Sequence, residues 1–157
     1  MLPALLRFGH RLPTDSSPCT RDLRYRGRGH QPLVLRDEAV VPGLLVVRMG
    51  VHTMSFERLT ESAEQCHENW GFWGLSVFEV PDGDYERLAR QRPASAAGSR
   101  MLIADGHELV DDGFPLLPTL DAPHWTVVLA APTAALFERV RGHFRGPIEN
   151  PVYRRTP

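Results

Sequence analysis

Lysine is absent from this sequence: all 18 residues counted as lysine or arginine are arginine. Isoleucine and asparagine are also scarce, with two of each. These three amino acids share AT-rich codons, so a GC-rich genome explains all three deficits. A role for arginine in binding phosphate explains only one of them. The excess of arginine therefore does not by itself indicate a nucleic-acid-binding protein.

Cysteine is equally sparse. Cys19 and Cys66 show no C-x-x-C spacing and are too few for a zinc site, so we expect free thiols in a reducing cytoplasm. No apolar run approaches the about 20 residues of a membrane span. The first apolar stretch is interrupted at Arg7 and is too short for a signal peptide. We expect a cytoplasmic protein with no membrane partner.

The common catalytic motifs are missing as well. The sequence has no P-loop, no G-x-G-x-x-G after a predicted strand, no H-E-x-x-H and no G-x-S-x-G. These absences argue against P-loop ATPases, Rossmann dinucleotide enzymes, zincin proteases and the common serine hydrolases. No two of the seven histidines are spaced as a helical i, i+4 pair, so no metal site is expected.

Charge is distributed unevenly along the chain. Residues 1–36 carry seven arginines against two acids, a balance of +5, while the remainder carries −6. Residues 1–31 lack periodicity and are rich in Pro, Gly, Ser and Arg, which predicts a basic arm. Such an arm suits contact with RNA or with an acidic protein surface. The alternative is a solvated extension that binds nothing.

After the arm, the pattern predicts one α+β (or mixed α/β) domain over 32–146 and a Pro-rich tail over 147–157. The domain would hold a single sheet of about five strands with two to three packed helices. Asp105-Gly106 is typical of a two-residue hairpin turn. The predicted strands cover 32–36, 44–49, 74–80, 100–104, 107–110 and 124–131, and the predicted helices cover 55–69, 85–91 and 132–144.

The helix predicted over 55–69 has the clearest periodicity. Its apolar residues recur at steps of three and four and so share one face: Phe56, Leu59, Ala63, Cys66 and Trp70. Acidic residues form a parallel line: Glu57, Glu61, Glu64 and Glu68. This line is either a solvated face or a docking surface for arginines, such as those of the arm.

The candidate catalytic residues lie near the ends of predicted elements: Arg48, His52, Ser76, Glu108 and His124. Arg48 ends an apolar strand and would need an anionic partner, either a ligand phosphate or an internal carboxylate. His52 and His124 could act as a general acid and base. Trp70 and Trp73 could stack on a base or a nicotinamide ring, or they could simply seal the core.

Two partial resemblances follow from these residues. His124-Trp125-Thr126 resembles half of the H-x-T signature of the two-histidine phosphoesterases, but His52-Thr53 does not supply the second half. Arg48, a helix, Ser76 and then Glu108 resemble the layout of the mono-ADP-ribosyltransferases. That resemblance implies NAD as a cofactor, held by Arg48 and Ser76. The chain departs from that family in having a single serine and no E-x-E or Q-x-E.

Two classes of function remain open at this point. One is a small bacterial, toxin-like enzyme, such as a transferase, that acts on a nucleotide (NAD) or on RNA. The other is a non-catalytic subunit that binds protein or RNA, either as an oligomer or with a cognate partner. A pocket shared by Arg48, Ser76, His52 and His124 would favour the enzyme.

Overall fold

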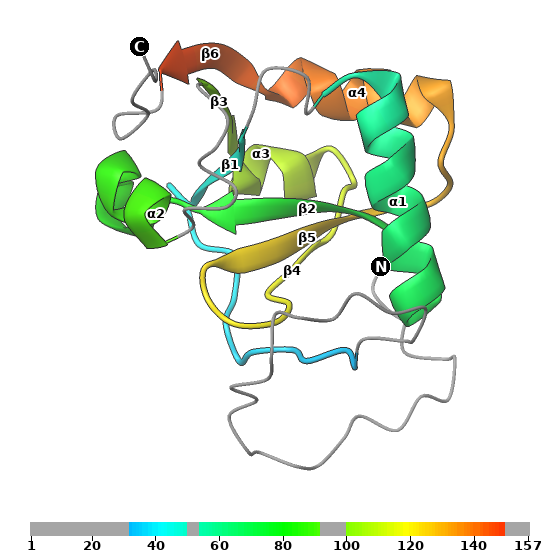
Figure 1. Ribbon diagram of the computed structural model, residues 1–157, viewed down its shortest axis with the longest axis horizontal. Coiled ribbons are helices and arrows are strands. Elements are labelled where there is room, and N and C mark those ends of the chain that lie inside the picture. Colours follow the sequence, from blue (N-terminus) through cyan, green and yellow to red (C-terminus); the bar gives the residue numbers. More distant parts are fainter. Residues whose placement is uncertain (1–31, 50–53, 92–99, 150–157) are drawn as a thin grey trace, which may run out of the picture.

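Six strands form one antiparallel sheet in the computed structural model, which describes residues 32–49, 54–91 and 100–149 (Figure 1). The strands are β1 (Leu45–Met49), β2 (Trp73–Glu79), β3 (Arg100–Asp105), β4 (Leu116–Leu117), β5 (His124–Leu129) and β6 (Arg145–Glu149). The helices of these residues are α1 (Phe56–Trp70), α2 (Tyr85–Gln91), α3 (Gly106–Asp111) and α4 (Ala134–His143), with a 3-10 turn η1 (Pro81–Gly83). The strand order is β4-β5-β2-β1-β3-β6, and the predicted α+β class is confirmed.

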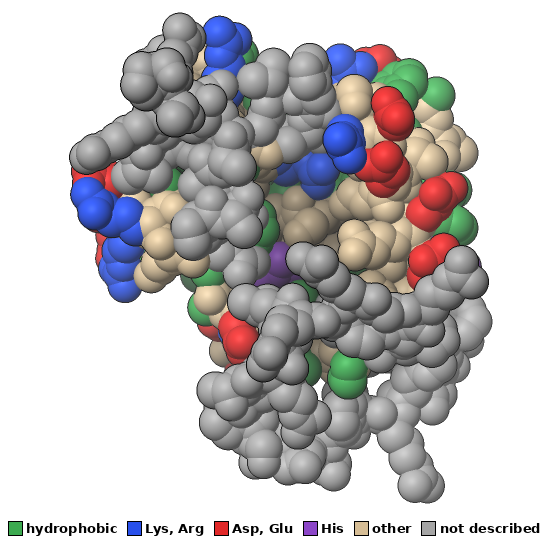
Figure 2. All heavy atoms as spheres, viewed as in Figure 1, with side chains coloured by type: hydrophobic (Ala, Val, Ile, Leu, Met, Phe, Trp, Pro, Cys, Tyr) green, Lys and Arg blue, Asp and Glu red, His purple; other side chains and the backbone are tan. Residues whose placement is uncertain are grey.

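Helix α1 begins and ends where the sequence predicts. The Ser55 side chain caps its start by accepting from the Arg58 amide, and Gly71 ends it at φ 77°. Its buried residues are Leu59, Ala63 and Cys66. Phe56 is an exception, because this first-turn residue is 40% exposed, and Trp70 is half-buried. The four glutamates are exposed, as expected, and acidic side chains gather over α1 in Figure 2.

Apolar side chains cover both faces of the sheet. On one face, β1, β2 and β5 contribute a core with α1, α3 and α4: Val46, Leu59, Leu75, Val77, Leu109, Trp125, Val127, Phe137 and Val140. A second, smaller cluster lies beside α2: Val47, Met49, Val80, Leu88 and Met101. β2 contributes Leu75 and Val77 to the first cluster and Phe78 to the second, which is why its sequence is apolar on both faces.

The predicted hairpin at Asp105-Gly106 is wrong, because this dipeptide begins α3. The Asp105 carboxylate accepts hydrogen bonds from the amides of His107 and Glu108, at 2.8 and 3.1 Å. A short acidic side chain suits a turn and a helix cap equally well, so the dipeptide alone does not decide between them. Gly106 is also tightly packed, since a Cβ there would lie 3.0 Å from a Leu116 methyl.

The sheet extends further along the chain than the sequence predicts. β4 lies within the segment 111–123, which was expected to be a loop, and β6 follows the strand expected to be last. β6 crosses the expected boundary at residue 146, and Pro147 is tolerated there because β6 is an edge strand. In place of the strand expected at 32–36 there is a single bridge, from Leu35 to Thr119. The arm, 1–31, lies outside the described residues.

Candidate functional site

Ser76 lies where β1 and β2 separate. The register between these strands includes only Val46 with Glu79 and Val47 with Phe78. Farther along β2, side chains bond the backbone of Ser76 instead. Its amide donates to Ser62 Oγ on α1 at 3.3 Å, and its carbonyl oxygen accepts from the Arg48 guanidinium at 2.8 Å. Ser76 is therefore held from two sides by polar side chains.

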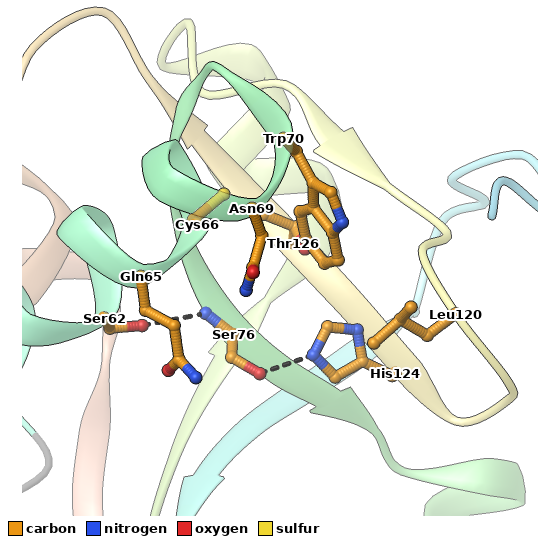
Figure 3. Close-up of a pocket in the computed structure, with 9 residues that line it drawn as sticks. All are labelled: Ser62, Gln65, Cys66, Asn69, Trp70, Ser76, Leu120, His124 and Thr126. Atoms are coloured by element: carbon orange, nitrogen blue, oxygen red, sulfur yellow. Dashed lines mark hydrogen bonds between the residues drawn. The ribbon is translucent and has the colours of Figure 1, made fainter. Parts of the chain in front are cut away.

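His124 reaches the Ser76 hydroxyl from the neighbouring strand. In the pairing of β2 with β5, Ser76 lies opposite Thr126 and Phe78 lies opposite His124, so these side chains project from one face. Ser76 Oγ and His124 Nε2 are 2.5 Å apart, as the dashed line in Figure 3 shows. His124 is itself buried, with 6% exposed.

The other ring nitrogen of His124 contacts Thr119. His124 Nδ1 lies 2.8 Å from Thr119 Oγ1 and 3.2 Å from the Thr119 carbonyl oxygen. A carbonyl oxygen can only accept, so we assign the ring proton to Nδ1. Nε2 then carries no proton and accepts a hydrogen bond from the Ser76 hydroxyl. Thr119 Oγ1 also contacts Thr126 Oγ1 at 2.7 Å, which fixes the threonine in turn.

A cavity of about 140 Å³ opens beside this pair. Figure 3 shows the side chains of α1, β2, β5 and the loop before β5 arranged around it. The described residues that line it are Ser62, Gln65, Cys66, Asn69, Trp70, Ser76, Leu120, His124 and Thr126. Apart from the titratable His124 and Cys66, these side chains are neutral.

Cys66 forms part of the wall without being a reactive thiol. Burial raises the pKa of the Cys66 thiol to about 12, so the sulfur stays protonated at neutral pH. The space around it depends on Gly74, because a Cβ there would lie 2.9 Å from Cys66 Sγ and 2.5 Å from Thr126 Cγ2. The hydroxyl of Ser76, in contrast, contacts a ring nitrogen of His124.

Arg48, on β1, supports the site by donating a hydrogen bond to the backbone of β2. It is 8% exposed, and burial lowers the pKa of its guanidinium to about 10, so it remains protonated at neutral pH. Its contact with the Ser76 carbonyl is of a kind that the sequence analysis did not consider, since we expected a ligand phosphate or a carboxylate. Bonding a guanidinium to a carbonyl offsets part of the cost of burying both groups.

The remaining sequence candidates lie elsewhere or are not described. Glu108 is on α3, not on a hairpin strand, and its carboxylate lies 3.4 Å from Arg145 rather than in the cavity wall. Trp73 stacks on His67, with the two ring centroids 4.0 Å apart, and it does not line the cavity. His52 lies outside the described residues. Of the two tryptophans, Trp70 alone lines the cavity.

Thr119 was missed by the sequence analysis, although it is fully buried and contacts both His124 and Thr126. It lies in a proline-punctuated segment with no periodic pattern. Its one sequence signal is its position five residues before His124.

Comparison of the chain with protein-family models, with curated proteins and with solved structures found no match. No group of three potential metal ligands occurs among residues 32–49, 54–91 and 100–149. Within the same residues, no helix combines the length and the apolar character that crossing a bilayer requires. Function must therefore be argued from the site itself.

Proposed function

We propose that this chain is an enzyme in which Ser76 is the nucleophile and His124 its general base. The observation that carries the proposal is the 2.5 Å contact between Ser76 Oγ and the bare Nε2 of His124. A serine hydroxyl is a weak nucleophile unless a base takes its proton as it attacks. A nucleophile, a base and a third group that orients the base are the parts that such a site needs, and Thr119 is the third group.

The reaction would proceed in two steps. Ser76 Oγ attacks an electrophilic carbon of the substrate while its proton passes to His124 Nε2. His124 then gives that proton to the leaving group, and the transferred group stays bonded to Ser76. Water or another acceptor attacks this intermediate and loses its proton to Nε2. The bond to Ser76 Oγ breaks, and Nε2 returns the proton to this oxygen, which regenerates Ser76. The imidazolium formed on the way donates through Nδ1 to Thr119.

The neutral walls indicate what the reacting part of the substrate is like. The side chains of Gln65 and Asn69 offer amide donors and acceptors, and Leu120 and Trp70 offer apolar surface. Such walls favour a small, uncharged polar group as the part that is transferred. A charged phosphate at this position would lose its hydration, and the described residues of the wall include no arginine to replace it.

Activated serines react with fluorophosphonates whatever their natural substrate, so this probe tests the proposal. Attack by Ser76 Oγ forms an O–P bond, breaks the P–F bond and releases HF. We expect mass spectrometry to locate the label on Ser76, and Ser76→Ala to remove it. His124→Ala should slow labelling by about 100-fold or more, the usual contribution of a positioned base.

The matched control is Ser55→Ala, which removes a hydroxyl from the start of α1, outside the cavity, and should label as fast as the wild type. Labelling that is absent from the folded protein, or that survives Ser76→Ala, would overturn the proposal. The non-catalytic binding subunit would then be the better account of this chain.

A second candidate, a nucleotide substrate, is favoured by one observation. Trp70 lines the cavity together with the carboxamides of Asn69 and Gln65, and a base or a nicotinamide ring could stack on the indole while bonding these amides. Titration with NAD, monitored by tryptophan fluorescence, tests this candidate. We expect quenching that Trp70→Phe removes and Trp73→Phe retains, since Trp73 does not line the cavity. If neither NAD nor nicotinamide alone quenches the tryptophan fluorescence, this candidate is contradicted.

A further inference from the structure

We propose that Arg36 is a positioning residue that holds His124 and Thr119 in place for Ser76. It acts through the backbone of the segment that runs from Pro118 to His124, and it does not touch the cavity. The effect on catalysis rests on the function proposed above. The effect on the geometry of His124 does not, and the two can be measured separately.

Three backbone carbonyls meet at one nitrogen of Arg36. Its Nη1 lies 2.9 Å from the carbonyl oxygen of Thr119, 2.9 Å from that of Leu120 and 2.8 Å from that of His124. Two of these carbonyls belong to the residues whose side chains contact each other at His124 Nδ1. Hydrogen bonds from a cation are stronger than those from a neutral donor, so one side chain fixes both ends of the segment.

The guanidinium is itself held firmly. Its Nε donates to Glu38 Oε1 at 2.9 Å, and its Cζ lies 5.6 Å from the centroid of the Trp125 ring. Only 15% of the side chain is exposed. A cation that is shielded from water and fixed on two sides can impose its geometry on a loop, whereas an exposed arginine would follow the loop's motion.

The backbone on either side of Arg36 is bonded to the same segment. The Arg36 amide donates to the Pro118 carbonyl at 2.8 Å, and the Leu120 amide donates to the Val34 carbonyl at 2.8 Å. Residues 34–36 therefore run alongside the segment and are hydrogen-bonded to it at both ends. These backbone bonds place the Arg36 guanidinium on the side of the segment where the three carbonyls converge.

The bend needs such a partner. Leu120 has φ 57°, a left-handed conformation that a residue with a side chain rarely adopts and that persists only when its surroundings hold it. The three converging carbonyl dipoles also repel one another unless a positive group lies between them. Without Arg36 we expect the carbonyls to turn apart, which would carry the Thr119 hydroxyl away from His124 Nδ1.

The first experiment follows the His124 ring and needs no activity. In ¹⁵N NMR of the imidazole nitrogens, the wild-type neutral ring should show a protonated Nδ1 and a bare Nε2. In Arg36→Gln, the two nitrogens should shift toward each other as the tautomers mix. The matched control is Arg58→Gln, which removes an exposed arginine paired with Glu61 and should leave both shifts in place.

The second experiment follows reactivity. Fluorophosphonate labelling of Ser76 should fall about 10- to 100-fold in Arg36→Gln, the usual cost of losing a group that orients a site residue. Ethylguanidine added to the variant should restore part of the rate, which a loss of stability alone would not allow. Arg36→Lys should lie between the wild type and Arg36→Gln, because an ammonium lacks the planar fork.

The outcomes separate the two proposals. Unchanged imidazole shifts and unchanged labelling in Arg36→Gln overturn the role of Arg36. If the shifts change but the wild type itself is never labelled, the positioning role stands and the nucleophile proposal fails. If Arg36→Gln does not fold, Arg36→Lys takes its place in both experiments. Imidazole shifts and a labelling rate equal to those of the wild type in Arg36→Lys would then contradict the role of Arg36.

Discussion

The carbonyl oxygen of Ser76 accepts a hydrogen bond from the buried guanidinium of Arg48 at 2.8 Å, across the gap where β1 and β2 separate. The cation is thus bonded to the backbone of Ser76, whose hydroxyl we propose as the nucleophile. This contact replaces the strand pairing that β2 lacks at this point. It makes Arg48 a structural support of the site, and the first prediction follows from that role.

Arg48→Met should lower the free energy of unfolding by about 1–3 kcal/mol, because the half-buried Ser76 carbonyl loses a charged donor. Urea denaturation measures the loss. Arg100→Met is the control: Arg100 is exposed at the start of β3, and its replacement should change the unfolding free energy by less than about 0.5 kcal/mol. Equal stability of Arg48→Met and the wild type would contradict the supporting role.

Thr119→Val keeps the shape of the buried side chain but removes the hydroxyl that contacts His124 and Thr126. We expect labelling of Ser76 by a fluorophosphonate to slow by about 10- to 100-fold, since His124 loses the group that orients it. Thr119→Ser retains the hydroxyl and should label at close to the wild-type rate. If the two variants label equally, the hydroxyl does not orient His124.

Asp112 gives a prediction about pH. Hydrogen bonds from His143, at 2.8 Å, and from Arg139, at 3.0 Å, lower the pKa of the Asp112 carboxyl. A depressed folded-state pKa contributes stability that is complete above the pKa of the unfolded chain, about 3.9, and is lost as the pH falls through the lower folded value. Asp112→Asn should therefore lower the melting temperature at pH 6.

That difference in melting temperature should shrink as the pH falls below about 3.9. The control variant is Asp82→Asn, which removes a carboxylate whose side chain is 91% exposed, and it should lower the melting temperature much less at pH 6. A deficit of Asp112→Asn that stays constant down to pH 2 would show that the carboxylate's charge does not stabilise the fold.

Two glycines make a matched pair for packing. In Gly74→Ala the new methyl would meet Thr126 and Cys66 at less than 3.0 Å, and we expect a loss of about 1–3 kcal/mol from overpacking. In Gly142→Ala, within α4, no described atom beyond the chain neighbours and the adjacent helix backbone lies within 4 Å of the new methyl. That variant should gain about 0.5–1 kcal/mol from helix propensity. Thermal denaturation of the two variants should therefore shift in opposite directions.

Local patterns in the sequence predicted the elements best. The helix that buries Leu59, Ala63 and Cys66 follows from periodicity within 15 residues. Phe56 fits the same period but lies on the first turn, where it is 40% exposed. The error at Asp105 arose because one side chain serves equally well in a turn and at a helix start.

The site was predictable only in part. Ser76 and His124 could be named as candidates from the sequence, but their contact depends on the register of β2 against β5, which no local pattern sets. No periodic sequence pattern marks Thr119 or Arg36. Thr119 lies in the irregular segment from Pro118 to His124, and Arg36 acts by bonding the backbone of that segment. Glu108 was a candidate because it could take the place of the glutamate in the mono-ADP-ribosyltransferase layout, but it lies on α3 with its carboxylate beside Arg145.

The two ends of the strand order have a consequence for how copies of this protein meet. β4, at one edge of the sheet, is only two residues long, and β6, at the other, contains Pro147, which has no amide hydrogen to donate. Both edges therefore present few backbone groups to an incoming strand. At the concentrations that crystallisation or NMR requires, the sheet itself should resist edge-to-edge aggregation.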